Sequence, residues 1–243
     1  MKKLYVVGIG PGGAEDMTYA AREAMDAADI IVGYSKYIEL VKPLYPEKPT
    51  FDTPMMREVE RCEAALKLAD EGKTTAMVCS GDAGVYGMSG LVLELSQDYP
   101  QVDVEVVPGV SACLAGGAVL GAPLTHDFAV ISLSDLLTPW PLIEKRLECA
   151  AMGDFCVALY NPSSKKRSDY LQKACDLMLK YKKPETVCGY VQNIGRQGEK
   201  YEVMTLAELR NAKVDMFTTV FIGNEQTKIV AGRMVTPRGY RLG

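Results

Sequence analysis

The sequence predicts an α/β fold in two domains, with a parallel sheet in the N-terminal domain and a mixed sheet in the C-terminal domain. In the first half, short apolar runs of strand length alternate with amphipathic segments of helical period, which is typical of a parallel sheet. Residues 121–125 interrupt this alternation with glycine and proline. The alternation then restarts, but the last strands lack long helices between them, which favours a mixed sheet. We therefore expect domains over residues 1–121 and 122–243.

The elements of the first half follow from their apolar patterns and their ends. The β-branched and aliphatic run 4–9 ends in glycines and predicts a strand, and the segment after it places alanine and methionine at helical spacing. Gly72 follows another expected helix, as glycine often does. The expected strands are 4–9, 30–32, 75–79 and 102–107, and the expected helices are 17–28, 58–71, 85–95 and 111–120.

The second half is predicted by the same criteria. Its helices are expected at 141–152 and 168–181. Its strands are expected at 128–133, 155–160, 186–191, 201–204, 218–222 and 229–235, with 201–204 as part of a hairpin.

Composition and charge exclude several classes of protein. Hydrophobic residues make up 48% and charged residues 24% of the chain, a balance that excludes disordered and fibrous proteins. The net charge of -4 argues against a general binder of nucleic acid. The apolar run near the start is broken at Gly8, too early for a signal peptide, and no run approaches the ~18 apolar residues of a membrane helix.

Cysteine and histidine usage argues against metal and disulfide frameworks. The seven cysteines are scattered and never form a C-x-x-C pair, so neither a disulfide framework nor a zinc ribbon is expected. His126 is the only histidine, which excludes a polyhistidine metal centre. We therefore expect no metal site and a reducing, cytoplasmic location.

The first loop, 8–13, has the spacing G-x-G-x-x-G between an expected strand and an expected helix, as in dinucleotide-binding folds. Pro11 within it has no N–H to offer a pyrophosphate, and Tyr34 stands where an acid would bind a ribose. The match to a dinucleotide site is therefore weak, and a purely structural turn is the other alternative.

Two further loops follow strands in the same way. Loop 80–87 combines glycines with Asp82 and has no lysine for a phosphate, so it suits a positively charged ligand better than an anion. Loop 108–112 has small side chains that let a ligand approach the backbone. Because the carboxyl ends of parallel strands meet at one edge, the three loops predict a shared binding site, although each alone could be a turn.

The ordered set of loops resembles the tetrapyrrole methylase family, whose members use S-adenosylmethionine (SAM), and the resemblance covers essentially the whole chain. The matching N-terminal segments are 7–12 (VGIGPG), 80–87 (SGDAGVYG) and 107–112 (VPGVSA). Within the family, four segments look like the branch that methylates C(17) of precorrin-3B in cobalamin synthesis: 120–128 (LGAPLTHDF), 131–140 (ISLSDLLTPW), 158–167 (ALYNPSSKKR) and 219–224 (TVFIGN).

This resemblance implies an activity and its alternatives. We expect methyl transfer from SAM to C(17) of precorrin-3B or its cobalt form, accompanied by ring contraction, with S-adenosylhomocysteine as the released product. A homodimer with no nucleic-acid or membrane partner is also expected. Methylation of another ring carbon by a member of the same family, and a noncatalytic tetrapyrrole carrier, are the alternatives.

The resemblance also implies the residues that contact SAM. The second domain is expected to complete the cleft for SAM and the tetrapyrrole, with two residues there and six in the first domain. These residues are Pro11, Ser80, Asp82, Val85, Ser111, Ala112, Asn161 and Gly189. Most are small or apolar, which fits recognition by main-chain groups, whereas Asp82 would supply a carboxylate.

Catalytic and substrate-binding residues are less clearly indicated. Relatives that methylate uroporphyrinogen carry an aspartate, proposed as a base, where this chain has Tyr34, which could instead hydrogen-bond the substrate. Ser132 and Asp135 could assist proton transfer or could cap the helix that follows. A tetrapyrrole precursor carries about eight acidic side chains, so its binding site needs basic residues. The alternative for each basic candidate is an ordinary solvated surface position. The candidates are Lys36, Lys165, Lys166, Arg167 and Arg196.

Overall fold

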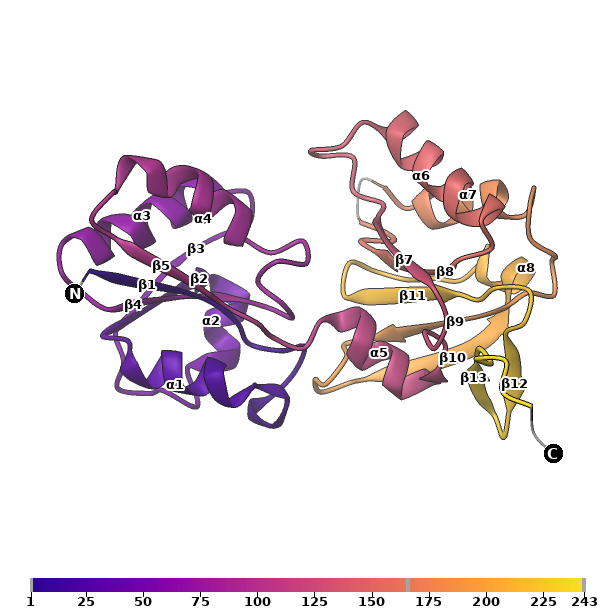
Figure 1. The fold of residues 1–243 in the computed structure, drawn as a ribbon, viewed down its shortest axis with the longest axis horizontal. Helices are drawn as coiled ribbons and strands as arrows, with labels where there is room; N and C mark the ends of the chain where they lie inside the picture. The colour runs from indigo at the N-terminus through magenta and orange to yellow at the C-terminus, as the bar shows by residue number, and fades with distance from the viewer. Residues whose placement is uncertain (1, 165–166, 242–243) are drawn as a thin grey trace. The chain divides into compact units, whose positions relative to one another are not determined.

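The computed structural model describes residues 2–164 and 167–241, and the chain forms two compact units, Met1–Ala112 and Cys113–Gly243 (Figure 1). The division falls at the start of helix α5 (Ala112–Leu120), whereas the sequence predicts a boundary after this helix. Helix α5 belongs with the second unit because it packs there. A Cβ atom on Gly116 would lie 3.0 Å from the ring of Phe221 in the second unit.

The first unit is a five-stranded sheet in which every pair of neighbours is parallel, as predicted. Its strand order is β3-β2-β4-β1-β5. The strands are β1 (Lys3–Gly8), β2 (Ile30–Tyr34), β3 (Thr50–Thr53), β4 (Thr75–Cys79) and β5 (Asp103–Val107). The sequence analysis did not anticipate β3, whose residues are largely exposed at the edge of the sheet.

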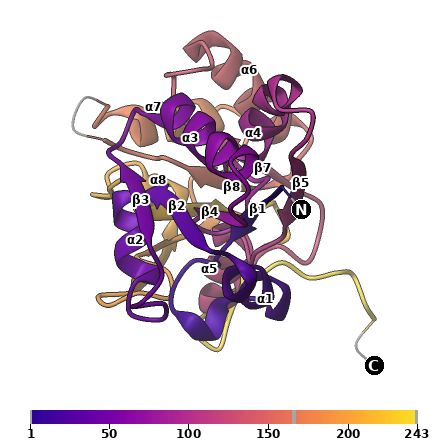
Figure 2. The ribbon, with the colours of Figure 1, turned by 90° about the vertical axis from the view of Figure 1, so that its left-hand side faces the viewer.

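Helices cover both faces of this sheet (Figures 1 and 2). Side chains of β1 alternate between the two faces: Val7 packs with α1 (Tyr19–Ala27) and α2 (Ser35–Val41), whereas Val6 packs with α3 (Glu58–Asp70) and α4 (Ser89–Leu95). Burial of both faces explains why the three central strands, β1, β2 and β4, are largely apolar runs. Two short 3-10 turns, η1 (Ala14–Asp16) and η2 (Ser96–Asp98), complete the unit.

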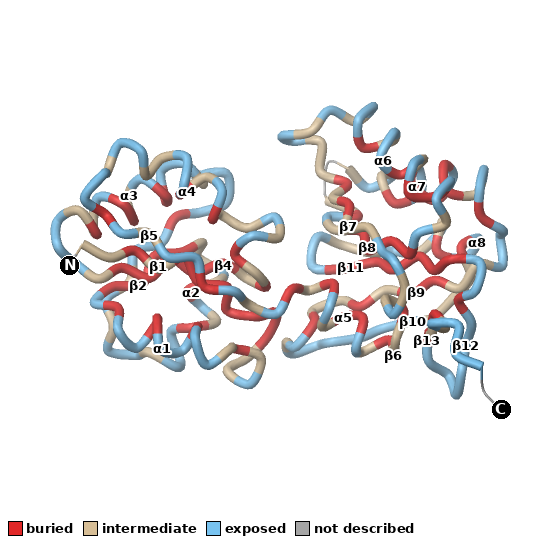
Figure 3. The backbone as a smooth tube through the Cα atoms, viewed as in Figure 1, coloured by how far each residue is buried: buried red, intermediate tan, exposed pale blue. Residues whose placement is uncertain are grey.

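The second unit contains the predicted mixed sheet, in the order β10-β9-β11-β8-β7. Only β7 and β8 are parallel neighbours, and the other pairs are antiparallel. The strands are β7 (Phe128–Ser132), β8 (Cys156–Tyr160), β9 (Val187–Gln192), β10 (Lys200–Thr205) and β11 (Thr218–Ile222). Helices α6 (Trp140–Met152), α7 (Tyr170–Met178) and α8 (Leu206–Leu209) share one buried core on this sheet (Figure 3).

Two sequence expectations about elements are wrong. The helix expected at 85–95 begins only at Ser89, because Tyr86 has a positive φ of 55° and the chain bends before the helix. The strand expected at 229–235 is a hairpin of β12 (Lys228–Val230) and β13 (Arg233–Val235), since Ala231 and Gly232 adopt the left-handed conformation. Strand β13 also pairs with β6 (Gly121–Ala122) in a small third sheet.

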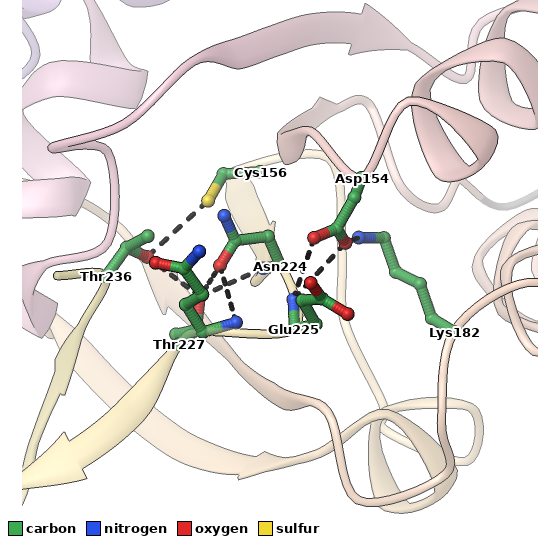
Figure 4. A network of polar contacts seen from close by, with 8 residues as sticks. Asp154, Cys156, Lys182, Asn224, Glu225, Thr227 and Thr236 are labelled. Atoms are coloured by element: carbon green, nitrogen blue, oxygen red, sulfur yellow. Dashed lines mark hydrogen bonds and ion pairs between the residues drawn. The ribbon is translucent and has the colours of Figure 1, made fainter. Parts of the chain in front are cut away.

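A buried polar network joins separate segments of the second unit (Figure 4). The Lys182 side chain is 3% exposed, and its Nζ lies 2.8 Å from Oδ1 of Asp154. Asp154 also accepts hydrogen bonds from the backbone N–H of Glu225 at 3.2 Å. Nearby, Thr236 shares a hydrogen bond of 2.8 Å with Thr227. The network therefore ties the segment before β8 and the segment after α7 to the loop that precedes the C-terminal hairpin.

In the part of the chain that the structure describes, no helix is long and apolar enough to cross a membrane. No group of three or more His, Cys, Asp or Glu side chains among these residues is arranged to hold a metal ion. All seven cysteines are free thiols, and burial raises the pKa of Cys79 to about 11.

Candidate functional site

The first two glycine-containing loops of the first unit are joined at the carboxyl edge of the parallel sheet. Gly10 N–H donates to the carbonyl of Gly81 at 3.1 Å, and Gly81 N–H donates back to the carbonyl of Gly10 at 2.8 Å. Both residues have positive φ angles, 76° and 71°, which glycine adopts without strain. Two loops that are far apart in the sequence therefore form one surface.

The third loop joins the same surface through Asp82. Its Oδ2 accepts a hydrogen bond from Gly109 N–H at 3.0 Å, while its Oδ1 accepts from Gly84 N–H at 2.8 Å and from Val85 N–H at 3.1 Å. A Cβ atom on Gly109 would lie only 2.2 Å from the carbonyl oxygen of Gly81. The three loops thus lie together, as predicted, and their close approach depends on glycine.

The other predicted SAM contacts in this unit occupy the same three loops. Pro11 and Ser111 are buried, and Ser80, Val85 and Ala112 are half-buried. Ser80 directly follows β4, the strand that precedes the second loop.

The predicted residues after β2 also lie at this edge. Tyr34 is the last residue of β2, a neighbour of β4 in the sheet, and its half-buried ring stands edge-on to Tyr37 with ring centroids 5.2 Å apart. Lys36 is exposed, and its Nζ lies 2.8 Å from a carboxylate oxygen of Glu39, which raises the pKa of the lysine. Its charge is therefore already paired on the surface of α2.

In the second unit, Ser132 and Asn161 lie together where two parallel strands end. Ser132 ends β7 and pairs in register with Tyr160, the last residue of β8. Asn161 donates a hydrogen bond from Nδ2 to Oγ of Ser132 at 3.0 Å, and Ser134 N–H donates to the same oxygen at 3.2 Å. Asn161 has a φ of 53°, which asparagine tolerates better than most residues.

A second cluster at this edge contains Asp135, Arg167 and Tyr170. Oδ1 of Asp135 accepts a hydrogen bond from Nε of Arg167, and Oδ2 accepts one from the hydroxyl of Tyr170 at 2.6 Å. These two hydrogen bonds, that of Tyr170 first, lower the pKa of Asp135. Neither Ser132 nor Asp135 caps α6, since its N-terminal cap Pro139 makes no side-chain hydrogen bond. The capping alternative for these two residues is therefore wrong.

Tyr170 is a member of this cluster that the sequence analysis missed. It begins α7, and its ring centroid lies 4.3 Å from that of Trp140 at the start of α6. No local signal distinguishes Tyr170 from other tyrosines, because its partner Asp135 is separated from it by 35 positions.

Three remaining candidates occupy different places. Gly189 is buried within β9, and a Cβ atom there would lie 3.1 Å from the methyl groups of Leu120, so helix α5 packs directly on it. Half-buried Arg196 lies in the turn after β9, which runs in the same direction as β8, so this turn is at the same edge of the sheet as Asn161. Lys165, with its neighbour Lys166, falls outside the described residues.

Comparison with known proteins identifies the class to which this fold and these loops belong. Residues 3–210 match the family model of tetrapyrrole (corrin/porphyrin) methylases, and the chain belongs to that family. It is therefore a methyltransferase, and SAM is the methyl donor of the family.

Individual relatives lie within the cobalamin branch of the family. The chain is 48% identical over 240 residues to the "probable cobalt-factor III C(17)-methyltransferase" of Salmonella typhimurium, covering 98% of this chain and 100% of that protein. It is 39% identical to the precorrin-3B C(17)-methyltransferase of a Sinorhizobium species, covering 98% of this chain and 96% of that protein. The crystal structure of the methyltransferase CobJ superposes with a TM-score of 0.89 at 34% identity, covering 96% of this chain and 99% of that one.

The joined loops of the first unit fit SAM, which carries a sulfonium and an ammonium group. Segments 8–13, 80–87 and 108–112 contain no lysine or arginine, and they include the carboxylate of Asp82. Their glycines bring peptide groups close together instead of side chains. Membership in this family favours SAM over the dinucleotide that the glycine spacing of the first loop also suggests.

Proposed function

We propose that this protein methylates C(17) of precorrin-3B, or of its cobalt-containing counterpart, with the accompanying ring contraction in cobalamin synthesis. The observation that carries the proposal is the 48% identity to a C(17)-methyltransferase over that protein's full length. The joined loops at the edge of the first sheet support the same proposal, because they offer a backbone-lined surface without cationic side chains.

The SAM contacts in this proposal are the eight residues that the family motifs indicate. The chemistry that SAM supplies is a methyl group attached to a positively charged sulfur. Pro11, Ser80, Val85, Ser111 and Ala112 would hold it chiefly by peptide groups, and Asp82 would keep the loops in place. Asn161 and Gly189 stay predicted contacts from the second unit.

The protein's task in such a transfer is alignment rather than covalent catalysis. An in-line displacement needs the acceptor carbon and the methyl group at the correct separation and angle, and orientation alone can supply much of the acceleration. No protein nucleophile is required. Tyr34 and Ser132 are the hydroxyl groups that we propose for hydrogen bonding or proton handling on the substrate. Asp135, the third residue that the sequence predicts for proton transfer, has both of its carboxylate oxygens occupied by hydrogen bonds.

The decisive experiment incubates the purified chain with SAM carrying a ¹³C-labelled methyl group and with precorrin-3B or its cobalt form. Product NMR is expected to place the label on C(17). Label on another ring carbon would show that the protein is a member of the family that methylates a position other than C(17). Tight binding of the tetrapyrrole without transfer of label to either substrate would support a carrier and overturn the proposal.

A calorimetric titration with SAM and with NAD tests the ligand separately. We expect heat of binding with SAM and none with NAD. Binding of NAD alone would contradict the assignment of the joined loops to SAM.

A homodimer and a cytoplasmic location are also part of the proposal. The location is supported by the seven free cysteines, since a reducing compartment keeps thiols from pairing. The dimer follows from the family resemblance, and light scattering coupled to gel filtration is expected to give twice the chain mass of 26.5 kDa. A monomeric mass at micromolar concentration would contradict it.

A further inference from the structure

Both carboxylate oxygens of Asp135 are already occupied within the second unit. Arg167 donates to one of them through Nε, and Tyr170 donates to the other through its hydroxyl at 2.6 Å. The Asp135 and Arg167 side chains are 28% and 23% exposed, so the pair lies partly out of solvent. A carboxylate held in this way is a poor proton acceptor, because both hydrogen bonds stabilise its charged form.

The hydrogen bond to Asp135 uses Nε of Arg167, which leaves the two terminal guanidinium nitrogens as donors for a ligand. Within residues 2–164 and 167–241, neither terminal nitrogen of this guanidinium has a hydrogen-bond partner. The backbone of Arg167 is held as well: its N–H donates to the carbonyl of Ser164 at 3.0 Å, and Ser164 N–H donates to the carbonyl of Arg167 at 3.3 Å. The two terminal nitrogens therefore form an oriented fork, which matches the two oxygens of a carboxylate.

Tyr170 is itself held in place by its aromatic neighbour. Its ring centroid lies 4.3 Å from that of Trp140, with the ring planes tilted by 41°, and Nζ of Lys173 lies 5.0 Å from the Tyr170 centroid. Because Trp140 and Tyr170 begin α6 and α7, the starts of two helices define where the Tyr170 hydroxyl points. A fixed hydroxyl in turn limits the rotation of the Asp135 carboxylate.

We propose that Asp135 and Tyr170 are positioning residues that aim the Arg167 fork at a carboxylate on the periphery of the tetrapyrrole substrate. The proposal rests on the proposed function, since that substrate supplies the carboxylate. It replaces proton transfer by Asp135 with an indirect role, in which the aspartate acts only through Arg167. The alternative, Asp135 as a general base, predicts different kinetics.

The test measures kcat and both KM values of methyl transfer for R167A, Y170F, D135A and the double variant R167A/D135A. In R167A the KM for the tetrapyrrole is expected to rise about 10- to 100-fold, with kcat and the KM for SAM nearly unchanged, because a bidentate ground-state contact is lost. Y170F is expected to raise the same KM about 3- to 10-fold. The double variant should match R167A, since Asp135 has nothing left to position.

Any of three outcomes overturns the proposal. If D135A lowers kcat by the same factor with and without Arg167, the aspartate acts on the reaction directly. If R167A keeps the wild-type KM for the tetrapyrrole, the fork does not bind the substrate. If Y170F keeps that KM, Tyr170 does not position the fork. The matched control is R146A, which removes an exposed arginine from the solvent side of α6 and should change neither KM.

Two further measurements keep these outcomes interpretable. Calorimetric affinity for SAM and the thermal unfolding midpoint show whether each variant is folded, and R167K is used if R167A is not. R167K keeps the charge but loses the fork, so its KM for the tetrapyrrole should still rise. A wild-type protein that transfers no methyl group to any tetrapyrrole would instead refute the proposed function.

Discussion

The Asp82 carboxylate and the Gly109 peptide N–H, 27 positions apart, form a hydrogen bond of 3.0 Å between the second and third loops. The other oxygen of the same carboxylate binds two N–H groups of its own loop. Asp82 thus holds three peptide groups at the edge where SAM binding is proposed. Its contribution to affinity would come from preorganised loops, whether or not it touches the ligand.

Removing this carboxylate is expected to weaken SAM binding without unfolding the chain. Asp82→Ala loses three hydrogen bonds, and we expect the Kd for SAM to rise about 10-fold or more, by calorimetry. In Asp82→Asn the amide can keep its oxygen toward Gly84 and Val85 but must present a donor to Gly109. Its Kd should therefore also rise. An unchanged Kd in both variants would remove Asp82 from any role at the site, and exposed Asp98→Asn serves as the control.

Adding a single methyl group at Gly109 should disrupt the contact between loops more severely. The Cβ atom of Gly109→Ala would lie 2.2 Å from the Gly81 carbonyl and 2.5 Å from the Gly8 carbonyl, and both obstacles are backbone. We expect a loss of about 1–3 kcal/mol in the free energy of unfolding, measured with urea, together with loss of SAM binding. Gly90→Ala, within α4, meets nothing within 4 Å, so it should leave SAM binding unchanged and should raise the free energy of unfolding by no more than about 1 kcal/mol.

The ion pair between buried Lys182 and half-exposed Asp154 in Figure 4 leads to a prediction about stability alone. Lys182→Met leaves Asp154 without its 2.8 Å partner, and because Asp154 is 39% exposed the cost is reduced by solvent. We expect a loss of about 1–2 kcal/mol in the free energy of unfolding. Lys182→Met combined with Asp154→Asn should lose less than the single variant. If the double variant lost more free energy of unfolding than Lys182→Met alone, the ion pair would not be the contact that holds the segments of Lys182 and Asp154 together.

Stability at acid pH should depend on Asp135. Its pKa is lowered in the folded protein by the hydrogen bonds from Tyr170 and Arg167. Its stabilising contribution is therefore complete above the unfolded pKa of about 3.9 and is lost as the pH falls through the lower folded value. Between about pH 5 and pH 2, the free energy of unfolding should fall less steeply for Asp135→Asn than for the wild type. Equal slopes in urea titrations would contradict the assigned contacts.

The sequence was most informative where structure is encoded locally. Strand 75–79 and strand 218–222 were predicted at their observed bounds, because both are buried along their whole length and so are continuous apolar runs. The helix expected at 85–95 failed at its start because the Asp82 side chain binds Gly84 and Val85 and the chain then bends at Tyr86. A polar side chain competing with the helix is a local event that apolar spacing does not record.

By itself, the sequence determined the class of fold, the position of the three loops after their strands, and membership in the tetrapyrrole methylases, since apolar periods and glycine motifs are written in consecutive residues. The tertiary structure alone decided which polar groups meet. It placed the Asp82 carboxylate on Gly109, and it placed Asp135 between Arg167 and Tyr170, which lie 32 and 35 positions further along the chain. Strand order and helix packing determine which of these residues meet, so residue spacing within the sequence does not predict such pairs.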